Sequence, residues 1–280
     1  MLILGADGTT VFESYEGPQT EFMELTIREA MIGGAAGPGK SMALLTVGIP
    51  QWAEEDRRWR EGEIRRSAGA ALYLRRTVPE LDESLVRAEE LFPLLDPGVD
   101  YERQAKLFTF SCGYRFKFDG IEHEKDKYKF RSKQFTFILP DELTSFTRSQ
   151  YDYICTRLRS TDPVLQKTLY IRASSTPEGE GLDWVRRRFV DPAPEGRTVL
   201  RDWVTMGDGE RVPRDRIFIP STLADNKNEV YRRQYEAELQ DKPPHIRDAL
   251  LYGNWNVVAN AYYAHAWIPR IHVVDLDEMF

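Results

Sequence analysis

Residues 34–41 read Gly34-Ala35-Ala36-Gly37-Pro38-Gly39-Lys40-Ser41, which fits the phosphate-loop pattern G-x-x-x-x-G-K-[ST] at every fixed position. In such a loop, successive backbone N–H groups point into one hollow and a helix begins at its end, so that oriented dipoles bind phosphate. We expect Lys40 to reach the β- and γ-phosphates of a nucleotide and the Ser41 hydroxyl to hold Mg²⁺. The stretch therefore predicts a nucleotide site on a helix N-terminus.

An acidic pair follows about 100 residues later, at the end of the apolar run Gln134-Phe135-Thr136-Phe137-Ile138-Leu139-Pro140-Asp141-Glu142. Such a run predicts a buried strand, and ligands of α/β proteins lie at the carboxyl ends of parallel strands. We expect Asp141 to contact Mg²⁺, directly or through water, and Glu142 to polarise the attacking water. Alone, the pair is more typical of a solvated strand end; together with the phosphate loop it indicates an NTP hydrolase.

Composition and charge exclude several classes of protein. The chain has 280 residues and a net charge of −7, so the molecule as a whole is not a basic nucleic-acid binder. Three basic clusters remain as candidate DNA contacts, although each is more often a solvated face: Arg57 to Arg66, Tyr101 to Lys133, and Arg186-Arg187-Arg188. The two cysteines, Cys112 and Cys155, form no metal or disulfide pattern, and no apolar stretch is long enough to span a membrane.

Strands alternate with helices along the chain, which predicts an α/β fold with a mostly parallel sheet flanked by helices. We expect strands at Met31-Ile32, 70–74, 107–118 as a pair, the run before Asp141, 168–173, and a short piece at Phe218-Ile219-Pro220. Residues 1–20 are expected to form an arm without regular structure. We expect a helix after Lys40, which Pro50 ends or kinks, and one after a cap near Thr77. Further helices are expected at 21–30, 148–158, 181–189, 229–239 and 244–251.

The order of the motifs resembles the ATPase region of the large terminase subunit of tailed bacteriophages, which uses ATP to drive DNA into a preformed capsid. Besides the phosphate loop, six blocks carry the resemblance: Gly17-Pro18-Gln19-x-x-Phe22, Leu74-Arg75-Arg76-Thr77-x-Pro79-Glu80-Leu81, Pro140-Asp141-Glu142-Leu143-Thr144-x-Phe146, Ser174-Ser175-Thr176-Pro177, Phe218-Ile219-Pro220-x-x-x-x-Asp225-Asn226, and Leu250-Leu251-x-Gly253-x-Trp255. Each block is weak alone, but seven in the same order are a strong signal.

The resemblance implies further roles. Gln19 and Phe22 would contact adenine, and Ser174, Ser175 and Thr176 would form a loop that couples hydrolysis to movement. It also implies a P-loop NTPase fold of the RecA-like type, with ATP and Mg²⁺ as ligands and a homo-oligomeric ring as the active form. The implied partners are double-stranded DNA, the capsid portal and the small terminase subunit, in the host cytoplasm at the procapsid vertex.

The sequence also departs from that family. Some relatives carry an arginine inside the phosphate loop, where this chain has Ala35 and Ala36. Other members have a trans-acting arginine just before the acidic strand, and Arg131 occupies that place, with Arg148, Arg157 and Arg159 as alternatives.

The domain division expected is an ATPase domain over 1–225, followed by a helical subdomain and linker over 226–280. Full-length relatives continue into a nuclease domain, which we do not expect in this chain. We interpret Asp275, Asp277 and Glu278 as solvated linker charge.

Three other functions remain open at this stage. A helicase-like translocase would need a second RecA-like domain, for which little chain follows Thr176. A small-molecule kinase fits less well, because Glu142 beside Asp141 suits water activation. A non-enzymatic docking module would bind ATP and hydrolyse it poorly.

Overall fold

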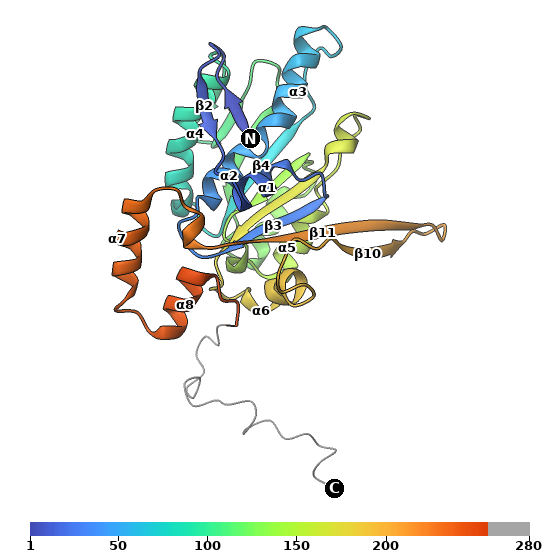
Figure 1. Ribbon diagram of the computed structural model, residues 1–280. Coiled ribbons are helices and arrows are strands. Elements are labelled where there is room, and N and C mark those ends of the chain that lie inside the picture. Colours follow the sequence, from blue (N-terminus) through green and yellow to red (C-terminus); the bar gives the residue numbers. More distant parts are fainter. Residues whose placement is uncertain (257–280) are drawn as a thin grey trace.

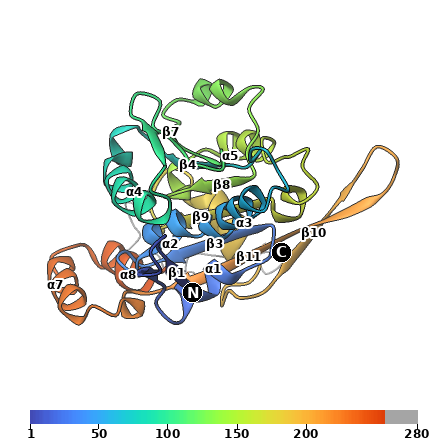
Figure 2. The ribbon, with the colours of Figure 1, turned by 90° about the horizontal axis from the view of Figure 1, so that it is seen from above.

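The computed structural model, which describes residues 1–256, is built around one mixed sheet of nine strands (Figures 1 and 2). The strand order is β10-β11-β3-β9-β8-β4-β7-β6-β5, and the six strands from β11 to β7 pair in parallel. Their bounds are β3 (Glu29–Gly34), β4 (Ala70–Arg75), β7 (Arg115–Gly120), β8 (Phe137–Pro140), β9 (Tyr170–Ser175) and β11 (Arg211–Ser221). The predicted fold class, a mostly parallel sheet flanked by helices, is confirmed.

Antiparallel strands extend the sheet at both edges. They are β10 (Leu200–Thr205) beside β11, and β6 (Leu107–Thr109) and β5 (Asp100–Glu102) beyond β7. The predicted pair within 107–118 is therefore present, with its turn at Cys112-Gly113. A separate hairpin of β1 (Leu2–Leu4) and β2 (Thr10–Glu13) stands where we expected an irregular arm.

Helices cover both faces of the sheet, which explains why the central strands are apolar on both sides. One face packs against α1 (Pro18–Glu24), α2 (Lys40–Thr46), α3 (Ile49–Arg60) and α4 (Asp82–Leu95). The other packs against α5 (Arg148–Cys155), α6 (Leu182–Val185) and the π-helical turn η5 (Arg186–Val190). Short 3₁₀ turns connect the elements: η1 (Pro79–Leu81), η2 (Glu124–Phe130), η3 (Leu143–Ser145), η4 (Leu165–Thr168) and η6 (Leu223–Asp225).

Several predicted boundaries are wrong for local reasons. The helix expected over 21–30 ends at Glu24, because Glu29 and Ala30 pair between β9 and β11 as strand residues. The helix after Lys40 is interrupted near Pro50, as expected, but the break falls after Thr46, and Pro50 stands in the first turn of the next helix, where proline is tolerated. The short piece at 218–220 is the end of an 11-residue strand, and β10 was not predicted at all.

The chain after β11 packs back onto the phosphate loop. Leu223, Leu239 of α7 (Glu229–Leu239) and Leu251 of α8 (Pro244–Tyr252) form a small apolar cluster with Ala35. The division at residue 225 stays a prediction. Asp275, Asp277 and Glu278 lie outside the described residues. Within the described part, no helix is long and apolar enough to cross a membrane.

The aromatic cluster beneath α4 generates a stability prediction. Phe92 has no exposed surface, and its ring centroid lies 5.0 to 5.3 Å from those of Phe108, Phe110 and Phe116. We expect Phe92→Ala to lower the free energy of unfolding by about 3–5 kcal/mol, because it leaves a cavity in a packed core. Urea denaturation checks this. Leu94→Ala, at a side chain 55% exposed on the same helix, is the control and should change stability by less than about 0.5 kcal/mol.

Candidate active site

The loop between β3 and α2 has the backbone that its glycines require. Gly34, Gly37 and Gly39 have φ values of 135°, 86° and 82°, which side-chain-bearing residues rarely adopt. A Cβ on Gly34 would lie 2.1 Å from the carbonyl oxygen of Ser221. The sequence pattern therefore encodes a loop that closely approaches the neighbouring strand.

Not every backbone amide of this loop is free to bind a phosphate. The N–H groups of Ala35 and Ala36 donate to the carbonyls of Ser221 and Leu250, both at 2.9 Å, and Pro38 has no N–H. The surface of the adjoining pocket is formed by Ala36, Gly37, Gly39, Lys40 and Ser41. We therefore expect phosphate contact at the N–H groups of Gly37, Gly39, Lys40 and Ser41, which line the pocket, and those at the start of α2 have no intrahelical acceptor. Gly34, Ala35 and Pro38 were also predicted as ligand contacts. They do not line the pocket and contribute to the shape of the loop instead.

Lys40 is buried, with 5% of its surface exposed, and its Nζ donates to the carbonyl of Ala35. Burial lowers the pKa of the Lys40 ammonium, and the carboxylates of Glu142 and Asp141 oppose that shift. A cation in this setting is poorly solvated, so an arriving phosphate would gain a strong charge-assisted partner.

Asp141 stands at the end of β8 and is fully buried. Its Oδ2 accepts from the Tyr73 hydroxyl at 2.6 Å, and its Oδ1 accepts from Ser174 and, at 3.4 Å, from the Ser41 hydroxyl. A carboxylate beside a hydroxyl is a donor set that suits Mg²⁺, which is usually held by one or two carboxylates plus substrate phosphates. The described residues contain no cluster of three or more His, Cys, Asp or Glu that could hold a metal alone.

Glu142 follows directly in an unusual conformation. Its φ of 55° and ψ of 63° are left-handed, a strained region for a non-glycine residue that is often found at functional sites. Its Oε2 accepts from the backbone N–H of Thr176 at 2.9 Å and from the Thr176 hydroxyl at 2.7 Å. These bonds orient the carboxylate along the wall of the pocket that contains Lys40.

The segment predicted as a coupling loop contacts both acidic residues. Ser174 donates to Asp141, Thr176 donates to Glu142, and the hydroxyl of Ser175 lies 2.9 Å from that of Thr144. All three residues of the segment are buried. The predicted loop is wrong for Ser174 and Ser175, which are the last residues of β9, paired with β3. The structure thus brings the end of this strand and Thr176 to the acidic pair, and the role in coupling stays a prediction.

The two residues predicted to contact adenine are placed differently. Gln19 lines the pocket, accepts from the Tyr15 amide at 2.5 Å and donates to the carbonyl of Gly39 at 3.1 Å. Phe22 is fully buried in the core and does not line the pocket. The predicted contact between Phe22 and adenine does not fit this placement, because a ring without exposed surface cannot stack on a ligand.

Arg131 lies away from this pocket. It caps the C-terminus of η2, is exposed, and lies over the Tyr128 ring at 5.7 Å from the centroid. It precedes the amino end of β8, whereas the acidic pair follows the carboxyl end. No role for Arg131 in its own chain's pocket follows from this position.

Sequence reasoning missed Arg75, which lines the pocket from the end of β4, with its Nη2 2.6 Å from Oδ2 of Asp141. It also missed Asn226, whose Nδ2 donates to the carbonyl of Gly37 at 2.6 Å, and Tyr231, which lies against Gly37. Arg75 and Asn226 stand in the quoted motif blocks, so the signal was present, but it did not state which atoms they contact.

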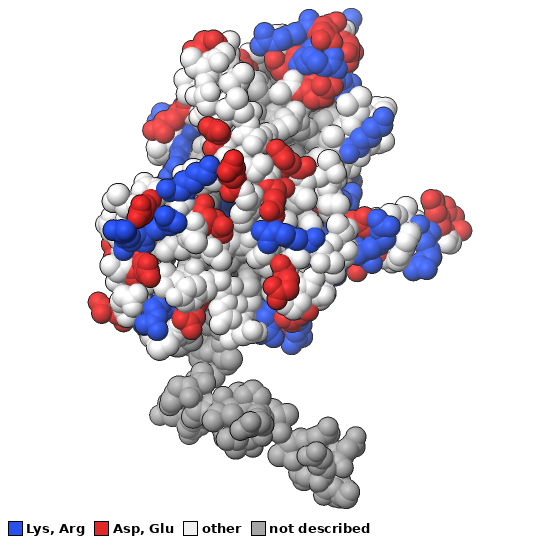
Figure 3. All heavy atoms as spheres, in the orientation of Figure 1, with Lys and Arg blue, Asp and Glu red and all other residues white. Residues whose placement is uncertain are grey.

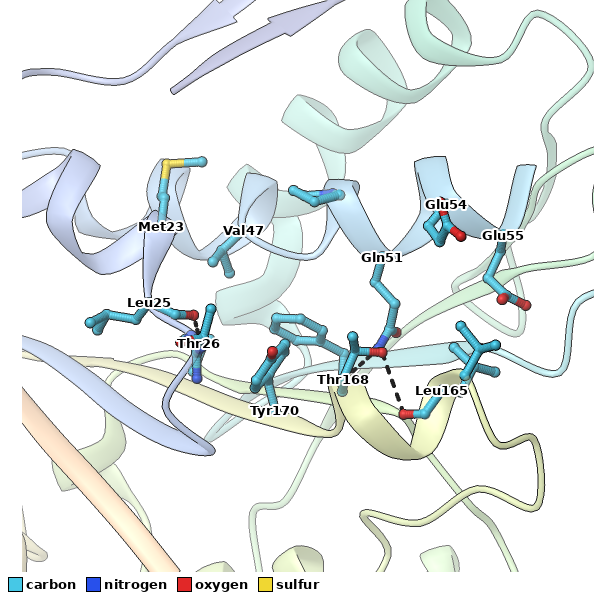
Figure 4. A pocket seen from close by; sticks show the side chains of 14 residues that line it. Met23, Leu25, Thr26, Val47, Gln51, Glu54, Glu55, Leu165, Thr168 and Tyr170 are labelled. Carbon is cyan, nitrogen blue, oxygen red and sulfur yellow. Dashed lines mark hydrogen bonds between the residues drawn. The ribbon is translucent and has the colours of Figure 1, made fainter. Parts of the chain in front are cut away.

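The pocket formed by these residues has a volume of about 680 Å³, which is in the range of sites for small-molecule ligands. A second pocket, of about 240 Å³, lies between α3, η4 and the start of β9 (Figure 4). Gln51 and Thr168 join across it through a 2.6 Å hydrogen bond, and its walls include Met23, Leu25 and Val47. It contains no phosphate-loop residue, so the larger pocket is the candidate site.

Comparison with protein families gives one finding that covers most of the chain. The family model described as terminase large subunit, T4likevirus-type, N-terminal, matches residues 31–270. No curated protein matches the chain in sequence.

Solved structures with a similar fold include the large terminase from a thermophilic bacteriophage, with a TM-score of 0.61 and 12% identity over 87% of this chain and 54% of that one. The same protein in complex with ADP gives a TM-score of 0.59 and 11% identity, with the same coverage. The large terminase ATPase domain of Thermus phage P74-26 gives 0.57 and 14%, over 86% of this chain and 93% of that one. At these identities the likeness concerns the fold alone. The chain spans about half the length of the first of these large terminases.

The close approach of the loop to β11 can be tested by Gly34→Ala. We expect a loss of roughly 2–4 kcal/mol in the free energy of unfolding, because the methyl group meets backbone rather than a movable side chain. Thermal or urea denaturation measures it. Gly62→Ala is the control: its φ is also positive, at 76°, but nothing lies within 4 Å of the added Cβ. Equal losses in both variants would contradict the close-approach explanation.

Proposed function

Because the chain belongs to the family of T4likevirus-type terminase large subunits, we propose that it hydrolyses ATP to drive double-stranded DNA into a viral procapsid. The observation that carries the proposal is that Lys40, Ser41 and Glu142 line one pocket and that the buried Asp141 accepts a hydrogen bond from Ser41 beside it. The Ser41 and Asp141 side chains are 3.4 Å apart although 100 residues separate them in the chain. Such a convergence fits phosphoryl transfer to water, where positioning and charge stabilisation supply most of the catalysis.

Some residues of the pocket would bind the nucleotide, and others would take part in its hydrolysis. The N–H groups of Gly37, Gly39, Lys40 and Ser41 bind the phosphates, the Lys40 ammonium neutralises charge on the β- and γ-phosphates, and Gln19 contacts the base. Ser41 and Asp141 would hold Mg²⁺, which when bound withdraws charge from the phosphate oxygens. Glu142, oriented by Thr176, accepts a proton from the attacking water.

An arginine from a neighbouring subunit would complete the site, which requires a homo-oligomeric ring. Arg131 is exposed and lies outside its own pocket, which supports a role toward a neighbour rather than within the chain. Stabilisation of this kind is worth about 10³–10⁵ in rate in other NTPases. Arg148 is a weaker alternative, because it already pairs with Asp152 at 2.8 Å.

DNA would be contacted mainly through its phosphates, since a motor must move along any sequence. Blue and red side chains are mixed over the face seen in Figure 3, so this face offers no continuous basic surface. Two of the basic clusters are largely paired: Arg57 and Arg58 with glutamates of and after α3, and Arg188 with Glu29 at 2.6 Å. The segment from Tyr101 to Lys133 also contains paired cations, among them Lys127 and Lys129. It is our preferred contact because other cations of the segment have no ion pair among the described residues: Lys106, Arg115 and Arg131. The capsid portal and the small terminase subunit are the further partners proposed.

ATP turnover measured against protein concentration, with and without DNA and portal, tests the proposal. We expect turnover that rises more steeply than in proportion to protein and is stimulated by DNA and portal together. Flat, negligible turnover in every mixture would favour an ATP-binding docking module, and strand unwinding would favour a helicase.

Glu142→Gln tests the assignment of the general base. We expect turnover to fall by about 10²–10⁴ while binding of Mg-ATP is kept, because the amide holds its place but cannot accept the proton. Steady-state phosphate release and calorimetry measure the two quantities. Glu180→Gln, at an exposed residue paired with Arg76, is the control and should retain activity. Near wild-type turnover in the Glu142 variant would refute the assignment.

Arg131→Ala tests the trans contribution. The variant should lose turnover only in the assembled ring, and mixing it with Glu142→Gln should restore part of the activity, because some interfaces then combine an intact base with an intact arginine. Arg233→Ala, at an exposed arginine that pairs with Glu229 away from both the pocket and this segment, is the control and should retain activity. Absence of any rescue in mixtures that assemble normally would count against this role.

A further inference from the structure

We propose that Arg75 is the cation that this chain uses within its own site in place of a phosphate-loop arginine. Before nucleotide binds it neutralises Asp141, and when Mg-nucleotide binds it turns to the oxygens of the γ-phosphate. The inference rests on the proposed function, because it assigns a residue to the same pocket.

The backbone fixes the starting position of Arg75. Strands β4 and β8 run in parallel with Leu74 opposite Pro140, and the amide of Asp141 donates to the carbonyl of Leu74 at 2.8 Å. Arg75 and Asp141 therefore leave the sheet side by side at its carboxyl edge. Their side chains meet at 2.6 Å, with Asp141 fully buried and the side chain of Arg75 20% exposed.

The charges around Arg75 and Asp141 favour one arrangement before a metal binds and another after it binds. A buried carboxylate needs a counter-charge, and Arg75 is its ion-pair partner among the described residues. A divalent cation arriving beside Ser41 would supply the same counter-charge. Arg75 and the metal would then repel each other across one carboxylate, which weakens the bond of Arg75 to Asp141.

The arginine has donors ready for another acceptor. Its Nε is buried and forms no hydrogen bond within the described part of the chain, and its side chain lines the pocket together with Lys40 and Glu142. Ala35 and Ala36 provide no charge in the phosphate loop. An anionic oxygen entering the pocket would therefore meet Lys40 from the loop side and Arg75 from the strand side.

Arg76, the next residue, provides a matched control. Its guanidinium bonds to Oε1 of Gln150 at 3.0 Å and to Glu180 at 2.9 Å, and it does not line the pocket. The two neighbours thus have the same charge and adjacent positions but different surroundings.

The test compares the affinities of AMP-PNP and ADP, each with Mg²⁺, by calorimetry in the wild type, Arg75→Ala, Arg75→Lys and Arg76→Ala. We expect Arg75→Ala to weaken AMP-PNP binding by about 10- to 100-fold and ADP binding by less than about threefold, since one charge-assisted contact to the γ-phosphate is lost. Arg76→Ala should leave both affinities unchanged. Arg75→Lys keeps the counter-charge of Asp141, so it should fold even where Arg75→Ala does not, and it should show a smaller loss for AMP-PNP alone.

A second readout needs no nucleotide. Because Arg75 competes with a metal for Asp141, Mn²⁺ alone should bind Arg75→Ala more tightly than the wild type, as measured by electron paramagnetic resonance. Equal losses for AMP-PNP and ADP, or unchanged affinities in a folded variant, would overturn the inference and leave the proposed function intact. A wild type that binds neither nucleotide would instead refute the proposed function.

Discussion

The buried carboxylate of Asp141 is the constraint around which the site is organised. A charge without exposed surface must be matched by donors, and those donors come from β4, β9 and the first turn of α2. One group thus fixes three segments that are far apart in the sequence. The acidic pair and the phosphate loop converge because the strands carrying them end at the same edge of the sheet, with β9 between β3 and β8.

The phosphate loop depends in turn on chain that follows β11. Ser221 and Leu250 accept the amides of Ala35 and Ala36, and Asn226 donates to the carbonyl of Gly37. These bonds occupy the N–H groups of Ala35 and Ala36 and the carbonyl of Gly37. The N–H groups nearer the helix remain available on the side of the pocket. Helix α8, through Leu250, and helix α7, whose Tyr231 lines the pocket, are therefore part of the site's geometry, even though they supply none of the predicted catalytic residues (Figure 1).

What the sequence predicted well has a local physical cause. The glycines of the loop are required by backbone conformation, and the central strands are apolar because helices cover both faces. Strand β10 was not predicted because it projects from the sheet and neither of its faces is buried. Its sequence therefore lacks the apolar pattern of a half-buried strand. Phe22 and Arg75 were misread or missed because burial and ion pairing depend on neighbours in space. A pattern gives the residue type at a position, but not which atoms of another strand it contacts.

The segment from Ser174 to Thr176, at the end of β9, is the element best placed to respond to charge at the pocket. It bonds to Asp141 through Ser174 and to Glu142 through Thr176, and further on Gly181 donates to the carbonyl of Thr144 at 2.7 Å. Bonds to charged groups are the strong ones in such a network, so any change in the charge that these carboxylates face alters the balance of forces on the whole segment. Glu142 adds a strained backbone at the same point, which makes its conformation depend on the Thr176 bonds that hold it. The end of β9 contacts η3, and η3 contacts α6, so the segment adjoins the helical layer of the protein rather than a loose surface loop.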